Sequence, residues 1–210
     1  MIRVFLLDDH ALVRTGFRLI LSQETDIDVV GEAASGEEGL ATIRKLKPDI
    51  VLCDLHLPGV SGLEVTDRIV RGEYGSRVII VSVQDDGPMP RKLLAAGASG
   101  YLGKACAADE LLRAVRAVAR GKRYLGADVA QRLALGELDS SSPFDALSPR
   151  EFEVAMMLCR GLRPEDVARR LRLSPKTVAT HKSRMFAKLD VGDTVAMARM
   201  AAQFGLIDAH

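Results

Sequence analysis

The sequence predicts two domains: an α/β domain built on a doubly wound, five-stranded parallel sheet, followed by an all-α domain. Three observations lead to this prediction. The chain has 210 residues, which is more than one domain usually holds. Up to about residue 120, short aliphatic runs alternate with amphipathic segments, whereas all later periodic segments have helical spacing. We therefore expect a first domain at residues 1–122, a linker with a short helix at residues 123–143, and a second domain at residues 144–210.

The strands of the first domain are predicted from five short aliphatic runs. They begin near residues 2, 27, 50, 78 and 100. The amphipathic stretches between and after them lie near residues 11–22, 36–46, 62–71, 88–96 and 107–120. Strands that are aliphatic throughout are typical of a parallel sheet covered by helices on both faces. In such a sheet the chemistry is expected at the carboxyl ends of the strands.

The linker follows the point where this alternation stops. A short helix is expected near residues 127–135, and the polar, turn-forming stretch at residues 137–143 separates it from the second domain. Four helices are expected beyond it, near residues 149–160, 164–171, 175–189 and 193–204.

The charge is unevenly distributed along the chain, although the net charge is only +1. Residues 1–125 hold 17 basic and 17 acidic side chains, whereas residues 160–188 hold nine Lys or Arg and two acidic residues. A charge run is usually a solvated face. Because this run coincides with a predicted helix pair, it favours a polyanionic partner.

Membrane association and disulfide bonding are not expected. The longest apolar runs fall far short of the roughly 20 residues that a membrane span needs, and a strand-like pattern begins at Met1, so we expect a cytoplasmic protein without a signal peptide. Cys53, Cys106 and Cys159 are widely spaced and fit neither a disulfide framework nor a zinc site. Buried, reduced thiols are the expected state of all three.

Polar side chains follow most of the predicted strands. Asp8 and Asp9 follow the first strand, Asp54 the third and Ser82 the fourth, and Lys104 comes soon after the fifth. A single Asp after a strand is more often a turn former, but the combination is unlikely to be a coincidence. Clustered carboxylates favour Mg²⁺ as their compensating ion. Asp54 is then a candidate nucleophile toward phosphorus, with Lys104 and Ser82 beside the phosphoryl oxygens.

These residues, together with Leu57-Pro58-Gly59 and Gly62, resemble the flavodoxin-like receiver domain over about 120 residues. The resemblance implies that Asp54 is the phosphoacceptor. It also implies Asp9 as a direct Mg²⁺ ligand, Asp8 as an outer-shell ligand and the backbone carbonyl of His56 as a third ligand.

The same resemblance assigns a switch. Ser82 would move toward the phosphoryl group while Tyr101 turns inward, although Tyr101 has the alternative of a half-buried strand aromatic. Lys104 is followed by Ala105 where receivers commonly have proline, which leaves the geometry of that peptide bond open. His10 is expected to start a helix beside the pocket rather than to bind metal, because no second histidine lies nearby.

Two serine-proline pairs mark helix starts in the second domain. Ser148, Pro149 and Glu151 supply an N-cap, a proline at the first helical position and a glutamate at the third. Ser174 and Pro175 repeat the serine-proline signal after a tight turn. The pattern predicts a helix-turn-helix.

The second helix of this motif has a predicted core face and a predicted outward face. Val178, Met185 and Leu189 recur at helical spacing and should face the core. The outward face presents hydrogen-bond donors suited to phosphates and base edges in a major groove, with a solvated charged helix as the alternative. The residues expected to contact DNA are Lys176, Thr177, Thr180, His181, Lys182, Arg184 and Lys188.

Residues from Leu147 to Leu189 resemble the LuxR-type helix-turn-helix over about 60 residues. The matching positions are Leu147-Ser148, Arg150-Glu151, Gly161-Leu162, Val167-Ala168, Leu171, Leu173-Ser174, Thr177-Val178, His181 and Lys188-Leu189. A receiver followed by this domain is the architecture of the NarL/FixJ family of two-component response regulators. Segments such as Arg123-Tyr124-Leu125 resemble the GacA/UvrY subgroup most closely. His181 and Ala179 differ from the residues that are common at these positions in related proteins. The resemblance therefore does not predict which DNA sequence the domain binds.

The resemblance implies a transcription factor rather than an enzyme, since a receiver catalyses only its own phosphoryl transfer and dephosphorylation. A hybrid sensor histidine kinase would phosphorylate Asp54 and so control dimerisation and binding to promoter DNA. Val195, Ala198 and Ala202 recur at helical spacing and are either a homodimer interface or part of the core.

Two alternatives remain from the sequence. A phosphatase-like enzyme also uses an aspartyl phosphate, but its nucleophile follows the first strand rather than the third. A transcription factor whose receiver binds a ligand or partner without phosphorylation is the other.

Overall fold

The computed structural model describes residues 1–82, 89–134, 142–171, 173–204 and 206–207. The amino-terminal domain is a parallel sheet with strand order β2-β1-β3-β4-β5-β6. Its strands are β1 (Ile2–Leu7), β2 (Ile27–Ala33), β3 (Ile50–Asp54), β4 (Arg77–Ser82), β5 (Gly100–Gly103) and β6 (Tyr124–Leu125). The doubly wound α/β fold is confirmed, with one short strand more than predicted.

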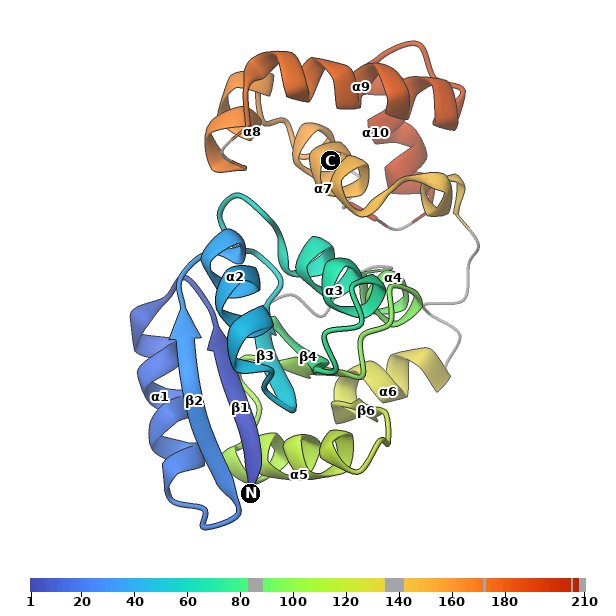
Figure 1. The fold of residues 1–210 in the computed structure, drawn as a ribbon. Helices are drawn as coiled ribbons and strands as arrows, with labels where there is room; N and C mark the ends of the chain where they lie inside the picture. Colours follow the sequence, from blue (N-terminus) through green and yellow to red (C-terminus); the bar gives the residue numbers. More distant parts are fainter. Residues whose placement is uncertain (83–88, 135–141, 172, 205, 208–210) are drawn as a thin grey trace.

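Helices cover both faces of the sheet (Figure 1). Side chains of α1 (Ala11–Ser22) and α5 (Ala108–Ala119) pack with one set of strand residues, which includes Leu6 and Leu52. The other face packs against α2 (Gly36–Leu46), α3 (Gly62–Arg71) and α4 (Met89–Ala95). Of the five strands predicted from aliphatic runs, β1, β3, β4 and β5 are mostly buried, as expected for a covered parallel sheet. The edge strand β2 is partly exposed, with Asp28 and Glu32 at the surface.

The sixth strand lies in the predicted linker. Tyr124 and Leu125 pair in parallel with Gly100 and Tyr101 of β5, and the Gly126 amide donates to the Tyr101 carbonyl over 2.8 Å. The following helix, α6 (Ala127–Ala134), places Val129 in the same core cluster as Tyr101. The linker therefore begins as part of the first domain; its predicted polar stretch at residues 137–143 lies mostly outside the described residues.

The second domain is helical, as predicted. It comprises the 3₁₀ helix η1 (Pro143–Ala146) and the helices α7 (Pro149–Cys159), α8 (Pro164–Arg170), α9 (Pro175–Leu189) and α10 (Thr194–Gln203). The predicted helix start at Ser148 is confirmed as a capping box, in which the Ser148 hydroxyl accepts from the Glu151 amide and the Glu151 carboxylate accepts from the Ser148 amide. Ser174 caps α9 by accepting from the Thr177 amide. These caps satisfy amides that have no partner within the helix.

The helical domain sits on the carboxyl edge of the sheet, with α7 nearest the first domain and α9 on the far side (Figure 1). The Arg150 side chain, on α7, donates to the carbonyl of Gly59 over 2.7 Å. Gly59 lies in the loop between β3 and α3, five residues after Asp54. The contact between the domains is therefore built on the loop that follows the predicted phosphoacceptor.

Membrane-spanning helices are not found in the part of the chain that the structure describes, since none of its helices is both long and apolar enough.

Candidate functional site

The predicted acidic side chains meet at the carboxyl edge of the sheet. Ligand atoms of Asp8, Asp9, His10 and Asp54 all lie within 4.8 Å of one another. Asp8 and Asp54 are each only 3% exposed, whereas Asp9 and His10 are open to solvent. The site is thus a half-open pocket with two buried carboxylates at its floor.

Lys104 joins the two buried carboxylates. Its ammonium lies 2.7 Å from Asp8 Oδ2 and 2.8 Å from Asp54 Oδ2. Burial by itself lowers the pKa of Lys104, but the hydrogen bonds and charges of Asp54 and Asp8 outweigh it and raise the pKa above its ordinary value. Lys104 therefore stays protonated and offsets the repulsion between the carboxylates.

Gly62 lets helix α3 start directly against the end of strand β3, where Asp54 lies. A Cβ atom at this position would lie 2.1 Å from the backbone oxygen of Asp54, so no side chain fits there. The Gly62 amide donates to the carbonyl of Leu55 over 3.0 Å. The glycine is needed for close backbone approach beside Asp54.

The donor set fits Mg²⁺. Three carboxylates provide the hard oxygen ligands that this ion prefers, and the open side at Asp9 leaves space for the waters that it keeps. Two of these carboxylates are buried and matched by the single ammonium of Lys104, which leaves a deficit of positive charge for a dication to fill. Asp8, Asp9 and Asp54 are the residues that would hold it.

His10 lies beside the pocket, at the start of a helix, as expected. The residue occupies the N-cap position of α1, as predicted. Its Nδ1 is, however, 2.8 Å from Asp9 Oδ1 and 3.2 Å from Asp8 Oδ1. The prediction relied on the lack of a second histidine, which says nothing about contacts between the imidazole and neighbouring carboxylates.

The predicted switch residues are both fully buried. Ser82 ends β4 and Tyr101 lies in β5, each with 0% exposure. The half-buried alternative for Tyr101 is therefore wrong in this structure, where the ring belongs to the core. The peptide bond between Lys104 and Ala105, left open above, is trans.

The cysteines carry no disulfide: Cys53, Cys106 and Cys159 are free. Cys53 is buried as expected, while the other two are half-buried. Burial raises the pKa of Cys53 well above its ordinary value and that of Cys159 to about 11, so these two thiols stay protonated at neutral pH.

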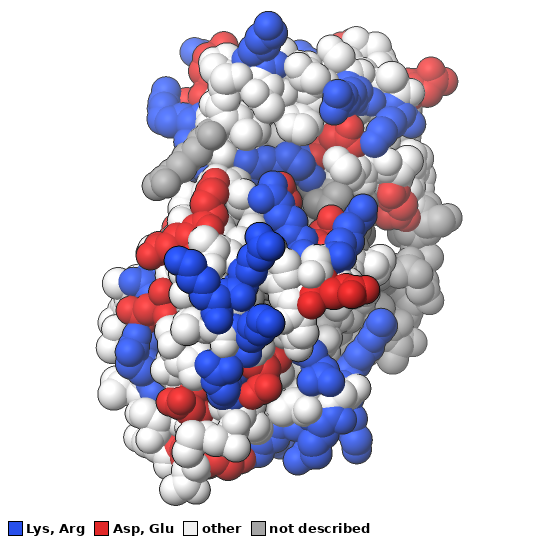
Figure 2. All heavy atoms as spheres, in the orientation of Figure 1, with Lys and Arg blue, Asp and Glu red and all other residues white. Residues whose placement is uncertain are grey.

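Helix α9 has the two faces that its sequence predicts. Val178, Met185 and Leu189 are buried in the helical core. Lys176, Thr180, Arg184 and Lys188 recur every four residues and are exposed on the opposite side. Figure 2 shows Lys and Arg side chains at the outer end of the helical domain.

Four of the residues expected to contact DNA have partners within the protein, and one of them, Thr180, donates its hydroxyl to the carbonyl of Lys176 over 3.0 Å. Thr177 is half-buried, with its Oγ1 at 2.7 Å from Ser174 Oγ. The Lys182 ammonium lies 5.3 Å from the centroid of the Phe186 ring, a cation–π contact. Lys188 donates to Glu151 Oε2 over 2.6 Å, and the Glu151 side chain is only 4% exposed. Lys188 therefore holds α9 onto α7, a role that the sequence did not indicate.

His181 is turned toward the first domain rather than outward. It is half-buried and lines a small cavity with Gly59 and Glu64 of that domain and with Arg150. Burial lowers the pKa of His181, and the Arg150 guanidinium adds to the shift. In this arrangement of the domains its imidazole does not belong to the exposed face of α9.

The stripe on α10 is at the surface. Val195 is 62% exposed, Ala198 and Ala202 are half-buried, and the core-facing residues of the helix are Met197 and Ala201. Of the two alternatives left open for this stripe, core packing is wrong.

The polar contact between the domains could not be predicted from the amino-acid sequence. Arg150 donates to Gly59 of the first domain and to Leu171 of the second, and lies 2.9 Å from the Glu153 carboxylate. Glu153 is hydrogen-bonded to Ser61, and burial raises its pKa. These partners are distant in sequence, so neither periodicity nor a local motif reveals them.

Comparison with known proteins places this architecture in a family. Residues 4–116 match the response regulator receiver domain, and residues 145–201 match the bacterial regulatory proteins of the luxR family. The chain belongs to the response regulators that join these two domains, a family of transcriptional regulators rather than enzymes.

The similar curated proteins belong to the subgroup that the sequence resembles. The chain is 42% identical to the response regulator GacA of Pseudomonas viridiflava over 212 residues, covering 100% of this chain and 99% of the relative. It is 41% identical to the response regulator UvrY of Escherichia coli K12 over 213 residues, covering 100% and 98%. A solved structure of two RcsB dimers bound to two parallel DNAs matches with a TM-score of 0.61 and 25% identity, covering 96% of this chain and 98% of that one.

Proposed function

We propose that a sensor histidine kinase, of the hybrid kind, phosphorylates this response regulator on Asp54 and thereby controls its dimerisation and its sequence-specific binding to promoter DNA. The observation that carries the proposal is the Lys104 ammonium within 2.8 Å of the buried Asp54 and Asp8 carboxylates at the carboxyl edge of the sheet. In this proposal the receiver domain spans residues 1–122, the linker residues 123–143 and the DNA-binding domain residues 144–210. The protein acts in the cytoplasm.

Each pocket residue has a role in the proposed transfer. An Asp54 oxygen forms a bond to phosphorus while the bond between phosphorus and the donor nitrogen breaks. The Lys104 ammonium leaves the Asp54 oxygen that is not phosphorylated and pairs with a phosphoryl oxygen. The Ser82 hydroxyl donates a hydrogen bond to another phosphoryl oxygen. Bound Mg²⁺, held by Asp8, Asp9, Asp54 and the His56 backbone carbonyl, would neutralise charge that develops on the phosphoryl oxygens. Tyr101 would respond to the movement of Ser82.

DNA binding is assigned to the exposed face of α9. Lys176, Thr180, Arg184 and Lys188 line this face, and Thr177 and Lys182, which are half-buried, are further candidates for DNA contact. His181 would contact DNA only if the domains separate, because its side chain faces a small cavity that the first domain also lines. The RcsB structure that holds dimers on DNA supports the expectation of a DNA-bound dimer. The α10 surface stripe of Val195, Ala198 and Ala202 is our candidate for the dimer interface.

Intact-mass spectrometry tests the assignment of Asp54. Acetyl phosphate with Mg²⁺ should add one phosphoryl group to the native chain and to Asp28→Asn, a control at an exposed acid away from the pocket. Asp54→Asn should stay unlabelled, and EDTA should prevent labelling of the native chain. Full labelling of Asp54→Asn, or of the native chain in EDTA, would overturn the assignment.

A further inference from the structure

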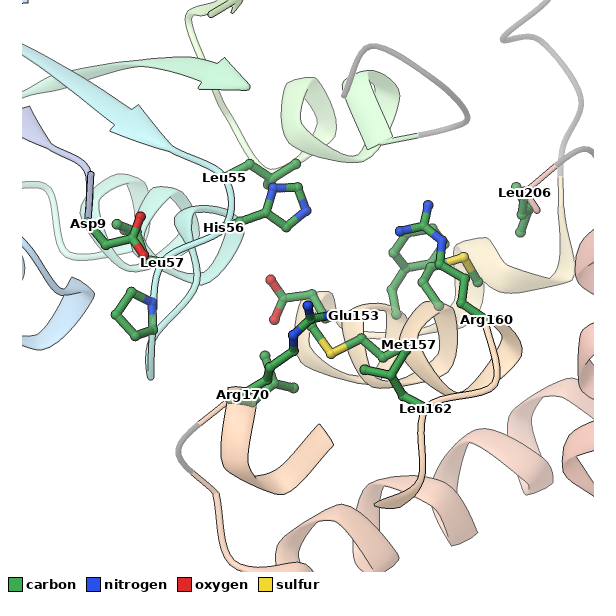
Figure 3. Close-up of a pocket in the computed structure, with 14 residues that line it drawn as sticks. Asp9, Leu55, His56, Leu57, Glu153, Met157, Arg160, Leu162, Arg170 and Leu206 are labelled. Atoms are coloured by element: carbon green, nitrogen blue, oxygen red, sulfur yellow. The ribbon is translucent and has the colours of Figure 1, made fainter. Parts of the chain in front are cut away.

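A cavity of about 470 Å³ separates the two domains beside the phosphoacceptor pocket. Asp9, Leu55, His56, Leu57 and Pro58 line it from the first domain, and the remaining lining residues come from the second (Figure 3). Ligand sites in proteins are commonly cavities of about 300–1,000 Å³ and are frequent at domain interfaces. The size and place of this cavity therefore suit a small molecule that touches both domains at once.

The wall from the second domain is largely apolar. Phe152, Met156, Met157 and Leu162 contribute to it from α7 and the turn that follows, and Leu206 adds to it from the carboxyl-terminal segment. Methionine side chains adapt to irregular shapes because they are unbranched and polarizable. Such a wall favours a flat or compact apolar body over a fully polar ligand.

The two arginines that line the cavity lack an acidic partner among the described residues. The Glu153 carboxylate is paired with Arg150, and Asp9 Oδ1 lies 2.8 Å from His10 Nδ1, a contact that is an ion pair only when His10 is protonated. Arg160 and Arg170 also line the cavity, and neither forms an ion pair with any residue that the structure describes. Guanidinium groups bind carboxylates well because their paired N–H donors match two oxygens.

The Arg160 side chain extends toward the side of the cavity that the first domain lines. In Figure 3 its guanidinium extends from the end of α7 toward the side where His56 lies, while Arg170 reaches up from α8 near Glu153 and Met157. Both guanidinium groups therefore stand at the cavity that His56 and its neighbours in the loop after Asp54 also line.

We propose that this interdomain cavity binds a small organic anion with an apolar body, an aromatic carboxylate being the best fit. Arg160 and Arg170 would hold the carboxylate, and the methionine and leucine side chains would enclose the body. Because the occupant contacts both domains, its binding stabilises their docked arrangement and opposes their separation. The chain would then respond to a chemical signal in addition to phosphorylation, and the proposal does not depend on Asp54 being modified.

Isothermal titration calorimetry on the full chain tests the site with 1-naphthoate, and with 1-naphthamide as a neutral molecule of similar shape. The acid should bind with one saturable site per chain, and the amide at least about tenfold more weakly, since hydrogen bonds between charged groups are lost. Arg160→Gln and Arg170→Gln should each weaken the acid about tenfold. Arg169→Gln, an exposed arginine on the same helix as Arg170 that pairs with Asp166 and does not line the cavity, should bind like the native chain.

Three results would overturn the proposal. The first is the absence of saturable naphthoate binding, and the second is equal binding of acid and amide or unchanged binding by both arginine variants. The third is inorganic phosphate binding as tightly as naphthoate, because the apolar wall would then contribute nothing. Hydrogen exchange adds a readout that does not depend on the variants: bound naphthoate should protect residues 55–58 and 156–162 together, and protection confined to one domain would contradict a bridging site.

Discussion

Lys104 has a role in the structure and a second role in the proposed phosphoryl transfer. In the structure its ammonium compensates Asp8 and Asp54, whose carboxylates would otherwise be buried side by side without a cation. The same nitrogen atom lies 2.8 Å from Asp54 Oδ2, so a phosphoryl group on Asp54 would be within its reach. The Lys104 ammonium could therefore pair with the free carboxylates before phosphorylation and with the phosphoryl group afterwards.

A second ion pair, between Lys188 and Glu151, has a structural role that can be measured. Glu151 is 4% exposed at its side chain and Lys188 is 41% exposed, so the pair is only partly screened by solvent. Replacing Lys188 by Met leaves the buried carboxylate without its cation, and we expect a loss of about 1–2 kcal/mol in the free energy of unfolding. Denaturant unfolding at pH 7 measures it, with Lys176→Met, an exposed lysine of the same helix, as the control.

The pH dependence of the same pair gives an independent check. Burial raises the pKa of Glu151, but Lys188 and the Ser148 donors outweigh it and leave the pKa below its ordinary value. The pair therefore stabilises the fold above the unfolded-state pKa of about 4.3, and this stabilisation is lost as the pH falls through the lower folded-state pKa. In Lys188→Met this acid-dependent loss should shrink. An unchanged pH profile would show that Lys188 does not stabilise the charged form of Glu151.

In the proposed DNA complex, helix α9 separates residues that supply charge from residues that distinguish bases. Lys176 and Lys188 lie near its ends, where phosphates flank a groove, whereas Arg184 lies nearer its middle on the same exposed face. An arginine can form two hydrogen bonds with a guanine, and a lysine at a phosphate mainly releases counterions.

Arg184→Ala should therefore weaken binding to a specific operator by roughly 1–3 kcal/mol and binding to random DNA much less. Lys176→Ala should instead lower the slope of log affinity against log salt by about one unit on both DNAs. Titrations at several salt concentrations measure both effects. If Arg184→Ala weakened both DNAs equally while Lys176→Ala abolished discrimination, the helix would be rotated differently in the groove.

Helix α10 offers a separate test of the dimer. Val195 is 62% exposed on a stripe with Ala198 and Ala202. Val195→Glu should keep the phosphorylated chain monomeric in light scattering, because a charge would be buried in the interface. Leu19→Glu is the matched control, since Leu19 on α1 is 61% exposed. Loss of the dimer in Leu19→Glu but not in Val195→Glu would place the interface on the first domain.

The elements differ in how much of them the sequence could reveal. Five strands and most helix bounds were predictable because their periodic patterns are long and their caps are local. Strand β6 was not, because its two residues pair through backbone atoms that leave no side-chain pattern. Helix η1 was missed although it has a signal: the Ser142 hydroxyl and the Asp145 carboxylate cap its start. The acidic pocket was predictable because parallel strands end at one edge.

The helical domain is docked on the loop that follows Asp54 in the first domain. Arg150 links that loop to the turn between α8 and α9 through the carbonyls of Gly59 and Leu171. Under the proposed function, we expect a change at Asp54 that moves this loop to act on the helix-turn-helix through Arg150 as well as through the linker at β6. No sequence pattern reports this docking, since it joins residues about 90 positions apart.

We propose that phosphorylation of Asp54 controls which DNA sites the chain occupies. Genome-wide mapping of bound sites, in matched cells that contain equal amounts of the native chain or of Asp54→Asn, tests this control. We predict that the sites occupied by the native chain under activating conditions are lost or strongly weakened in Asp54→Asn. The same sites bound to the same extent by both proteins would contradict the claim.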